Sequence, residues 1–289
     1  MKITFWGTRG SIPVPGRDTT LYGGNTTCVE VRLAGGETVI IDAGTGIRRL
    51  GEVLRSRNGM GPIYLLMTHV HWDHIIGFPF FAPGLPAGTE LLVDGHPNAM
   101  MGLQHTFDNP MGGGYFPIKI EELDLRIRFL NAVGRRPLEL GGGKVDSIPL
   151  RHPQGGLGFR IREGDRTLAF ITDNELEDGE ALEDYVDFCR GADVLIHDAQ
   201  YAPEEMDAHR GWGHSDYEMA LELARRAETP RLILFHHDPS RTDAELKAFE
   251  LLCRDLASKK SSPMQIEAAR EDSEIHLGGD SPAYEEPGS

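Results

Sequence analysis

The chain has few cysteines, and those it has are poorly placed for a disulfide framework. Cys28, Cys189 and Cys253 are scattered over 289 residues, and no two of them have CxxC spacing. An odd number of cysteines without a short-range pair is typical of reduced thiols in the core of a cytoplasmic protein. We therefore expect a cytoplasmic location and no disulfide-rich secreted fold.

Basic residues are also scarce. Lysine and arginine together number 29, aspartate and glutamate number 45, and the formal net charge is −16. A protein that binds nucleic acid over much of its surface needs clustered lysine and arginine to neutralise phosphates. The composition excludes that class and leaves room for a local basic patch only.

Long apolar runs are missing as well. No run approaches the ~20 residues that cross a bilayer, and residues 1–5 predict a strand rather than the apolar core of a signal peptide. We find no repeat and no linker, so we expect one domain over residues 1–278 and no membrane association. Residues 279–289 are Gly, Pro, Ser and acid with few apolar side chains, a composition that predicts a disordered tail.

Residues 63–74 are the most informative segment of the sequence. An apolar run over residues 63–67 predicts a buried strand, and His69, His71, Asp73 and His74 follow within six positions. Imidazole nitrogens and carboxylate oxygens are ligands that zinc and similar divalent metals prefer. Alternate residues of an extended segment share a side, so His69 and His71 can bind one ion, while Asp73 and His74 point towards a second.

Other predicted strands also deliver His or Asp at their carboxyl ends. His152 follows residues 144–149, Asp173 follows 167–171, His197 follows 193–196 and His236 follows 231–235. Strand ends are where clefts form, so one shared cleft accounts for all of these side chains. We expect His197 to stand behind the metal ligands and orient one of them rather than to bind an ion.

Asp42 ends a further strand, over residues 37–41, and opens a Gly-rich turn. Its carboxylate either caps that turn or orients a metal-bound histidine from behind. The sequence leaves both roles open.

Residues 96–120 show weak periodicity and are rich in methionine, glycine and aromatic side chains. An irregular segment of this length predicts a lid or binding loop. A contact in a homodimer is an equal alternative, and a homodimer is our expectation.

The residues from His69 to His74 resemble the HxHxDH motif of the metallo-β-lactamase superfamily of hydrolases. The resemblance implies an α/β fold, an αββα sandwich of two mixed β-sheets flanked by helices. It also implies two divalent metal ions, with zinc expected and manganese as the alternative. By the same resemblance the first ion is held by His69, His71 and His152, the second by Asp73, His74 and His236, and Asp173 bridges both. His236 fits better than His237 because it directly follows its strand.

Three further segments, residues 5–8, 197–200 and 213–215, are similar to motifs of the ribonuclease Z-like phosphodiesterase branch. This chain departs from that branch at Asp198-Ala199-Gln200, in place of Glu-Ala-Thr, and at Asp216, in place of Thr. The resemblance implies that Asp73 orients or deprotonates the attacking water and that His214 stabilises or protonates the phosphate oxygens. If His214 lacks this role, it merely precedes a helix capped by Ser215.

The substrate we expect is a cyclic or short nucleotide phosphodiester. Residues 7–13 and 22–26 look like those of small phosphodiesterases, including cyclic-nucleotide hydrolases, and no long basic arm suited to tRNA is present. Tyr115 or Phe116 could stack on the base, which is a sequence-tolerant contact, or both could be core anchors. The alternatives are a ribonuclease Z-like RNA endonuclease and a non-catalytic metal-binding sensor or scaffold.

Overall fold

The computed structural model describes residues 1–57, 61–81, 85–108, 125–177, 179–260 and 263–278. Tyr115, Phe116 and the predicted tail at 279–289 lie outside these residues. Within the described ranges the strands form two sheets of seven strands each. Both sheets contain antiparallel and parallel pairs, as the sequence predicted.

The first sheet is built mainly from the first half of the chain. Its order is β14-β1-β2-β3-β4-β5-β6. The pairs from β14 to β3 are antiparallel, and those from β3 to β6 are parallel. The strands are β1 (Lys2–Gly7), β2 (Cys28–Arg32), β3 (Thr38–Ile41), β4 (Ile63–Met67), β5 (Thr89–Gly95), β6 (Leu125–Phe129) and β14 (Glu274–His276).

The second sheet has the order β13-β12-β11-β10-β9-β8-β7. Here the pairs from β7 to β10 are antiparallel, and those from β10 to β13 are parallel. The strands are β7 (Leu138–Glu139), β8 (Lys144–Leu150), β9 (Gly156–Glu163), β10 (Arg166–Ile171), β11 (Val194–Asp198), β12 (Arg231–Phe235) and β13 (Gln265–Ala268).

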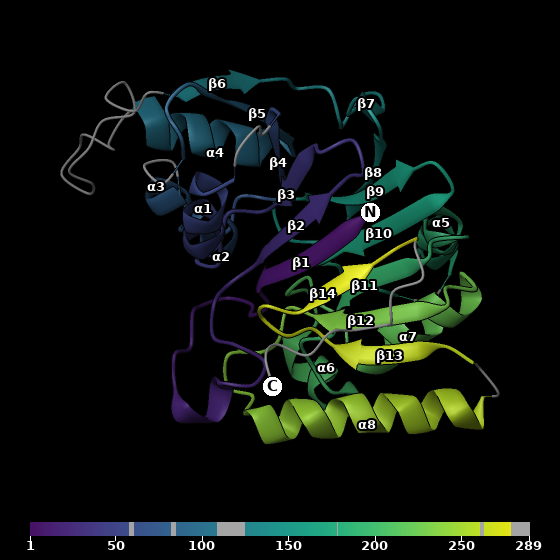
Figure 1. Ribbon diagram of the computed structural model, residues 1–289. Coiled ribbons are helices and arrows are strands. Elements are labelled where there is room, and N and C mark those ends of the chain that lie inside the picture. Colours follow the sequence, from purple (N-terminus) through teal and green to yellow (C-terminus); the bar gives the residue numbers. More distant parts are fainter. Residues whose placement is uncertain (58–60, 82–84, 109–124, 178, 261–262, 279–289) are drawn as a thin grey trace.

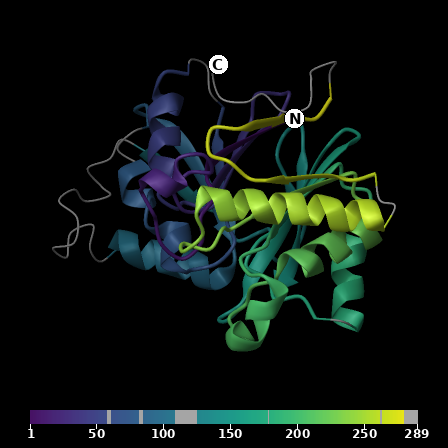
Figure 2. The ribbon, with the colours of Figure 1, turned by 90° about the horizontal axis from the view of Figure 1, so that it is seen from below.

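Helices cover the outer face of each sheet, as Figures 1 and 2 show. On the first sheet they are α1 (Ile47–Arg55), α2 (Trp72–Ile75), α3 (Phe78–Phe81) and α4 (Pro97–Asp108). On the second they are α5 (Glu180–Cys189), α6 (Met206–His209), α7 (Tyr217–Arg226) and α8 (Asp243–Lys259), with short 3-10 turns at η1 (Arg17–Thr19) and η4 (Pro203–Glu205). The layers therefore confirm the predicted αββα sandwich. Within the described ranges, no helix combines the length and the apolar character needed to cross a bilayer.

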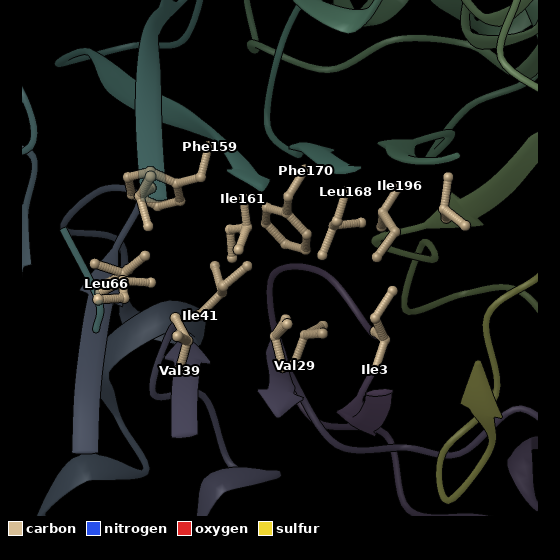
Figure 3. Close-up of a cluster of buried hydrophobic side chains, with 14 of the residues drawn as sticks. Ile3, Val29, Val39, Ile41, Leu66, Phe159, Ile161, Leu168, Phe170 and Ile196 are labelled. Carbon is tan, nitrogen blue, oxygen red and sulfur yellow. The ribbon is translucent and has the colours of Figure 1, made fainter. Parts of the chain in front are cut away.

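The main core lies between the two sheets. Figure 3 shows Val39, Ile41 and Leu66 of the first sheet facing Phe159 and Ile161 of the second. Because helices cover the outer faces, the central parallel strands are apolar on both sides, and every residue of β11 and β12 is buried. This burial explains why their sequences run without alternation.

One secondary-structure prediction was wrong. Part of the segment expected to be irregular, residues 97–108, is the helix α4. Its periodicity is hard to see because Met101 is 59% exposed beside the buried Ala99, Met100 and Leu103. Residues 109–120 of that segment lie outside the described ranges.

Leu168 provides a test of the inter-sheet core. It is fully buried, so Leu168→Ala should lower the free energy of unfolding by about 2–5 kcal/mol through lost burial and a residual cavity. Leu251→Ala is the matched control, because Leu251 is 52% exposed on α8 and should cost about 0.5 kcal/mol or less. Urea denaturation measures both, and equal losses would contradict the placement of Leu168.

Candidate metal centre

The carboxyl ends of strands from both sheets meet at one edge and bring the predicted ligands together. β4 leads to His69, His71 and α2, and β8, β10 and β12 lead to the ligand-type residues of the second sheet. Three groups of ligand-type side chains gather there. Two share no residue, His69, His71, His152 and Asp73, His74, Asp173, His236, and a third, His152, Asp173, His214, shares one residue with each of them. The arrangement agrees with the two-ion site that the motifs implied.

The first group consists of three imidazoles. The Nε2 atom of His152 lies 2.9 Å from the Nδ1 atom of His71. The outer nitrogen of each ring faces an oxygen acceptor, since His152 Nδ1 lies 2.9 Å from the carbonyl oxygen of Gly213 and His71 Nε2 lies 2.8 Å from Oε1 of Gln154. With protons on the outer nitrogens, the two inner nitrogens face each other as lone pairs. A cation between them would stabilise that arrangement.

His69 supports the same interpretation. Its Nε2 atom is buried and has no hydrogen-bond partner among the described residues. Buried polar atoms are normally satisfied, so an orphaned imidazole nitrogen that points into a cluster of ligands fits a missing metal ion. The donor set, imidazole nitrogen with carboxylate oxygen, is the set that zinc accepts.

The second group is buried and tightly packed. His236 Nε2 lies 3.1 Å from Oδ2 of Asp73 and 3.2 Å from Oδ1 of Asp173. His74 Nε2 lies 3.2 Å from the same Asp73 oxygen and 3.3 Å from His236 Nε2. Asp173 Oδ1 also lies 3.7 Å from His69 Nε2, so one carboxylate oxygen reaches both groups, as a bridging ligand must.

The ionisation states of three of these residues suit metal ligands. Burial alone would raise the pKa of Asp173, but the charges of His236, His74 and His69 bring it well below the ordinary value. Burial likewise opposes ionisation of Asp73, and its histidine neighbours again bring the pKa well below the usual range. Burial lowers the pKa of His69 well below its ordinary value. Ionised carboxylates and a neutral imidazole are the forms that bind a metal.

Asp42 stands behind His74. Its Oδ2 atom lies 2.7 Å from His74 Nδ1 and accepts the hydroxyl proton of Thr68 at 2.7 Å, while Oδ1 accepts the backbone N–H of Thr68 at 2.8 Å. Of the two roles open for Asp42, this geometry favours orientation of a histidine ligand. The contact leaves His74 Nε2 directed at the other ligands.

Sequence reasoning missed two glutamines with the same kind of role. Gln200 Oε1 lies 2.9 Å from His236 Nδ1, and Gln154 Oε1 lies against His71. Gln200 belongs to the segment 197–200 singled out above, so its position carried a signal. Gln154 carried none beyond its closeness to His152 in the chain.

His214 lies beside both groups. Its ring stacks on that of His236 with centroids 5.0 Å apart, and its Nδ1 atom lies 3.5 Å from Asp198 Oδ2 and 3.9 Å from Asp173 Oδ1. Burial alone would lower the pKa of His214, but Asp198 and Asp173 raise it above the ordinary value. The sequence did not single out Asp198 as the partner of His214.

The helix after His214 begins differently from the prediction. Asp216, not Ser215, caps α7, because its carboxylate accepts the N–H groups of Glu218 and Met219. The Ser215 hydroxyl instead donates to the carbonyl oxygen of Asn174 at 2.6 Å, and the Ser215 N–H donates to Asp198 at 2.9 Å. Ser215 therefore fastens the His214 loop to the ends of β10 and β11.

His197 and His237 lie farther from the ligands. We expected His197 to contact a metal ligand. Its Nδ1 atom instead lies 2.7 Å from the carbonyl oxygen of Asp198. His237 Nε2 lies 2.8 Å from the carbonyl oxygen of Ala269, and burial lowers the pKa of His237 to about 3. The ligand group contains His236, in line with the preference for that residue over His237.

The loop after β1 closes over the second group. The N–H of Ser11 donates to Asp73 Oδ2 at 2.7 Å. A Cβ atom on Gly10 would lie only 2.3 Å from His236 Cε1, so no side chain fits at this position. Gly10 thus allows the backbone to approach the ligands closely.

The sandwich and its edge cluster define a metallo-β-lactamase fold. Residues 37–237 match the model of the family described as Beta-lactamase superfamily domain, and the chain belongs to that family. The resemblance inferred from the motifs is confirmed.

Curated relatives include Ribonuclease Z of Haloferax volcanii, which is 24% identical over 82% of this chain and 84% of the relative. Ribonuclease Z of a Synechococcus species is 25% identical, with 83% and 87% covered.

Similar solved structures include the metallo-β-lactamase fold protein YhfI of Bacillus subtilis, with a TM-score of 0.69, 18% identity and coverage of 94% and 97%. Human tRNase Z, short form, has a TM-score of 0.67, 20% identity and coverage of 96% and 100%. Zn²⁺-bound PqqB of Methylobacterium extorquens has a TM-score of 0.70, 16% identity and coverage of 96% and 100%. At these identities the structures support the fold alone.

The ligand assignment predicts the metal content of single variants. His71→Ala and His236→Ala should each lose bound metal relative to two ions per chain, because each removes a converging nitrogen. His237→Ala is the control and should retain both ions, since its ring faces Ala269. Elemental analysis of folded, dialysed protein measures this. Metal loss from His237→Ala together with full retention in His236→Ala would show that the last ligand is misassigned.

A substitution at Asp42 should weaken metal binding without abolishing it. Asp42→Asn keeps the size of the side chain but removes the charge behind His74, so metal affinity should fall about 10- to 100-fold. Asp94→Asn is the matched control, because Asp94 is a buried carboxylate that accepts the N–H groups of Ala132 and Val133. Competition with a chelator measures affinity. Equal losses in both variants would assign Asp42 a structural role only.

Proposed function

We propose that the chain is a dinuclear metal-dependent phosphodiesterase that acts on cyclic or short nucleotide phosphodiesters. The observation that carries the proposal is His214, which lies 3.9 Å from the bridging carboxylate of Asp173 and 3.5 Å from Asp198. His214 also forms a third ligand-type group with His152 and Asp173, but the three residues of the first group and the four of the second already converge without it, so we assign His214 to the substrate rather than to an ion. A buried imidazole of raised pKa at their edge suits a role in chemistry.

The assigned ligands are His69, His71 and His152 for one ion, Asp73, His74 and His236 for the other, and Asp173 for both. Ions bound there supply Lewis acidity and a water of lowered pKa. The nitrogen-rich donor set favours zinc, with manganese as the alternative.

Two residues of the chain would move protons. Asp73, held by the Ser11 N–H, would orient the attacking water and accept its proton. His214, with Nδ1 directed at Asp198, keeps Nε2 for the substrate and would donate a proton to the leaving oxygen. The raised pKa of His214 favours the protonated form that a general acid needs.

A ribonuclease Z-like RNA endonuclease is the second candidate. The curated relatives named Ribonuclease Z favour it. Against it stands the formal charge of −16. A tRNA would meet an acidic surface outside a local patch.

A non-catalytic metal-binding sensor or scaffold is the third candidate. It would need the ligands but not the pair formed by His214 and Asp198. The pair therefore favours an enzyme.

The free and buried state of the three cysteines is compatible with the proposed cytoplasmic location.

Asp73 and His214 should have separable effects. Asp73→Ala should abolish turnover of bis-p-nitrophenyl phosphate and weaken one metal site. His214→Ala should retain both metals yet lower kcat about 10²- to 10⁴-fold, the range for a lost general acid. His276→Ala, on the exposed end of β14, is the control. Full activity of metal-loaded His214→Ala would remove the catalytic role of that residue.

A substrate screen tests the class of substrate. The metal-loaded enzyme should hydrolyse small nucleotide phosphodiesters, tested as 2′,3′- and 3′,5′-cyclic nucleotides and as short linear ones, more efficiently than a precursor tRNA. A higher kcat/KM for the precursor tRNA would favour the endonuclease. No turnover of any diester at full metal content would favour the sensor or scaffold.

A further inference from the structure

A cavity of about 460 Å³ opens beside the metal centre. We propose that it binds a second anionic group of the substrate through Arg151 and Arg210, which narrows the substrate to a phosphodiester that carries another phosphate. This inference rests on the proposed phosphodiesterase function.

The cavity adjoins the reaction centre. His152 belongs to the first metal group and also lines the cavity, and Gly213, the residue before His214, forms part of the wall. A diester held at the ligands would therefore reach the cavity directly past His152. The volume lies within the ~300–1,000 Å³ range of small-molecule sites.

Glu175 fixes the wall in place. Its carboxylate accepts the N–H of Gly211 at 2.8 Å and that of Gly213 at 2.9 Å, and its own N–H donates to the carbonyl oxygen of Arg151 at 3.0 Å. The Gly213 carbonyl in turn accepts from His152. Because amide N–H groups occupy both oxygens of Glu175, this carboxylate is a structural group rather than a ligand for a cation.

The two arginines have replaceable partners. Arg151 pairs with Glu177 at 2.5 Å, with the side chains 41% and 45% exposed. Arg210 pairs with Asp207 at 3.2 Å, with the side chains 68% and 96% exposed. Surface pairs of this kind contribute little, so a phosphate can displace the carboxylates. A guanidinium binds phosphate through two parallel N–H groups, which is geometry that lysine lacks.

Because the chain as a whole is acidic, a cavity that contains two arginines differs in charge from most of the protein. The cavity is lined by Arg151 and Arg210 and also by Glu175 and Glu177. Backbone N–H groups hold Glu175, so the anion site requires a phosphate to displace Glu177 from Arg151 and Asp207 from Arg210. A cyclic mononucleotide has one phosphate, which the metal centre would occupy. A phosphodiester with a second phosphate on another hydroxyl, whether linear or cyclic, fills both places.

Two chromogenic esters test the proposal. They are thymidine 5′-(p-nitrophenyl phosphate) and its 3′-phosphorylated derivative, which differ by one phosphate. The wild type should show a KM about tenfold lower for the 3′-phosphorylated ester, the size of effect expected for hydrogen bonds to a charged group. Arg210→Ala, and more strongly the double variant with Arg151→Ala, should abolish that difference and leave kcat unchanged. Arg210→Lys should restore part of it.

Arg190→Ala is the matched control. Arg190 forms an i,i+3 pair with Asp187, as Arg210 does with Asp207, but it lies at the end of α5 outside the cavity. Equal KM values for the two esters in the wild type would overturn the proposal. Equal effects of Arg190→Ala and Arg210→Ala would also overturn it.

Calorimetry separates this inference from the proposed function. Thymidine 3′,5′-bisphosphate should bind the metal-loaded wild type more tightly than thymidine 5′-monophosphate, and Arg210→Ala should remove the preference. If neither ester is hydrolysed but the preference is present, the phosphodiesterase function fails and the anion site stands. If the esters are hydrolysed without a preference, the anion site fails alone.

Discussion

The burial of carboxylates and imidazoles against one another is the constraint on which the edge of this sandwich depends. Asp42, Asp73 and Asp173 are buried around His74. Burial alone would lower the pKa of His74, but these three carboxylates raise it well above its ordinary value. Without an ion, the proton on His74 offsets the buried negative charge. If His74 binds an ion as proposed, that ion would compete with the proton, and metal affinity would then depend on pH at this residue.

Three of the residues that meet at this edge have unusual backbone conformations. Asp42, Asp173 and His236 have φ angles of 61°, 57° and 56°, in the left-handed region that non-glycine residues rarely adopt. Each lies within two residues of the end of β3, β10 or β12, so the chain turns sharply where the strand stops. Such residues cost of order 1–3 kcal/mol each, and they persist where the surrounding core holds them. The apolar contacts between the sheets provide that support.

Much of this arrangement could be predicted from local patterns. Apolar runs followed by His or Asp predicted β4, β8, β10 and β12 and the ligand-type residues after them. This was possible because the burial and the end of a strand depend on residues that are neighbours in the sequence. Contacts between distant residues could not be predicted in this way. Gln154 contacts His71, which is 83 positions away in the chain. The hydroxyl of Ser215 does not cap the helix because it donates to the carbonyl oxygen of Asn174, 41 positions away. Tyr115 and Phe116 lie outside the described residues, so the stacking role stays a prediction.

Membership of the family indicates hydrolysis, whereas the choice of substrate depends on what surrounds the candidate metal centre. Proteins of 16–25% identity match this chain under several names, so the cluster alone does not choose between RNA and a small diester. Charge does help to choose. At physiological ionic strength an exposed charge acts over about 8 Å, so in the proposed anion site Arg151 and Arg210 would attract only the part of a substrate close to their cavity. A long polyanion would extend beyond that range over a chain of net charge −16, whereas a short nucleotide with two phosphates would lie wholly within it.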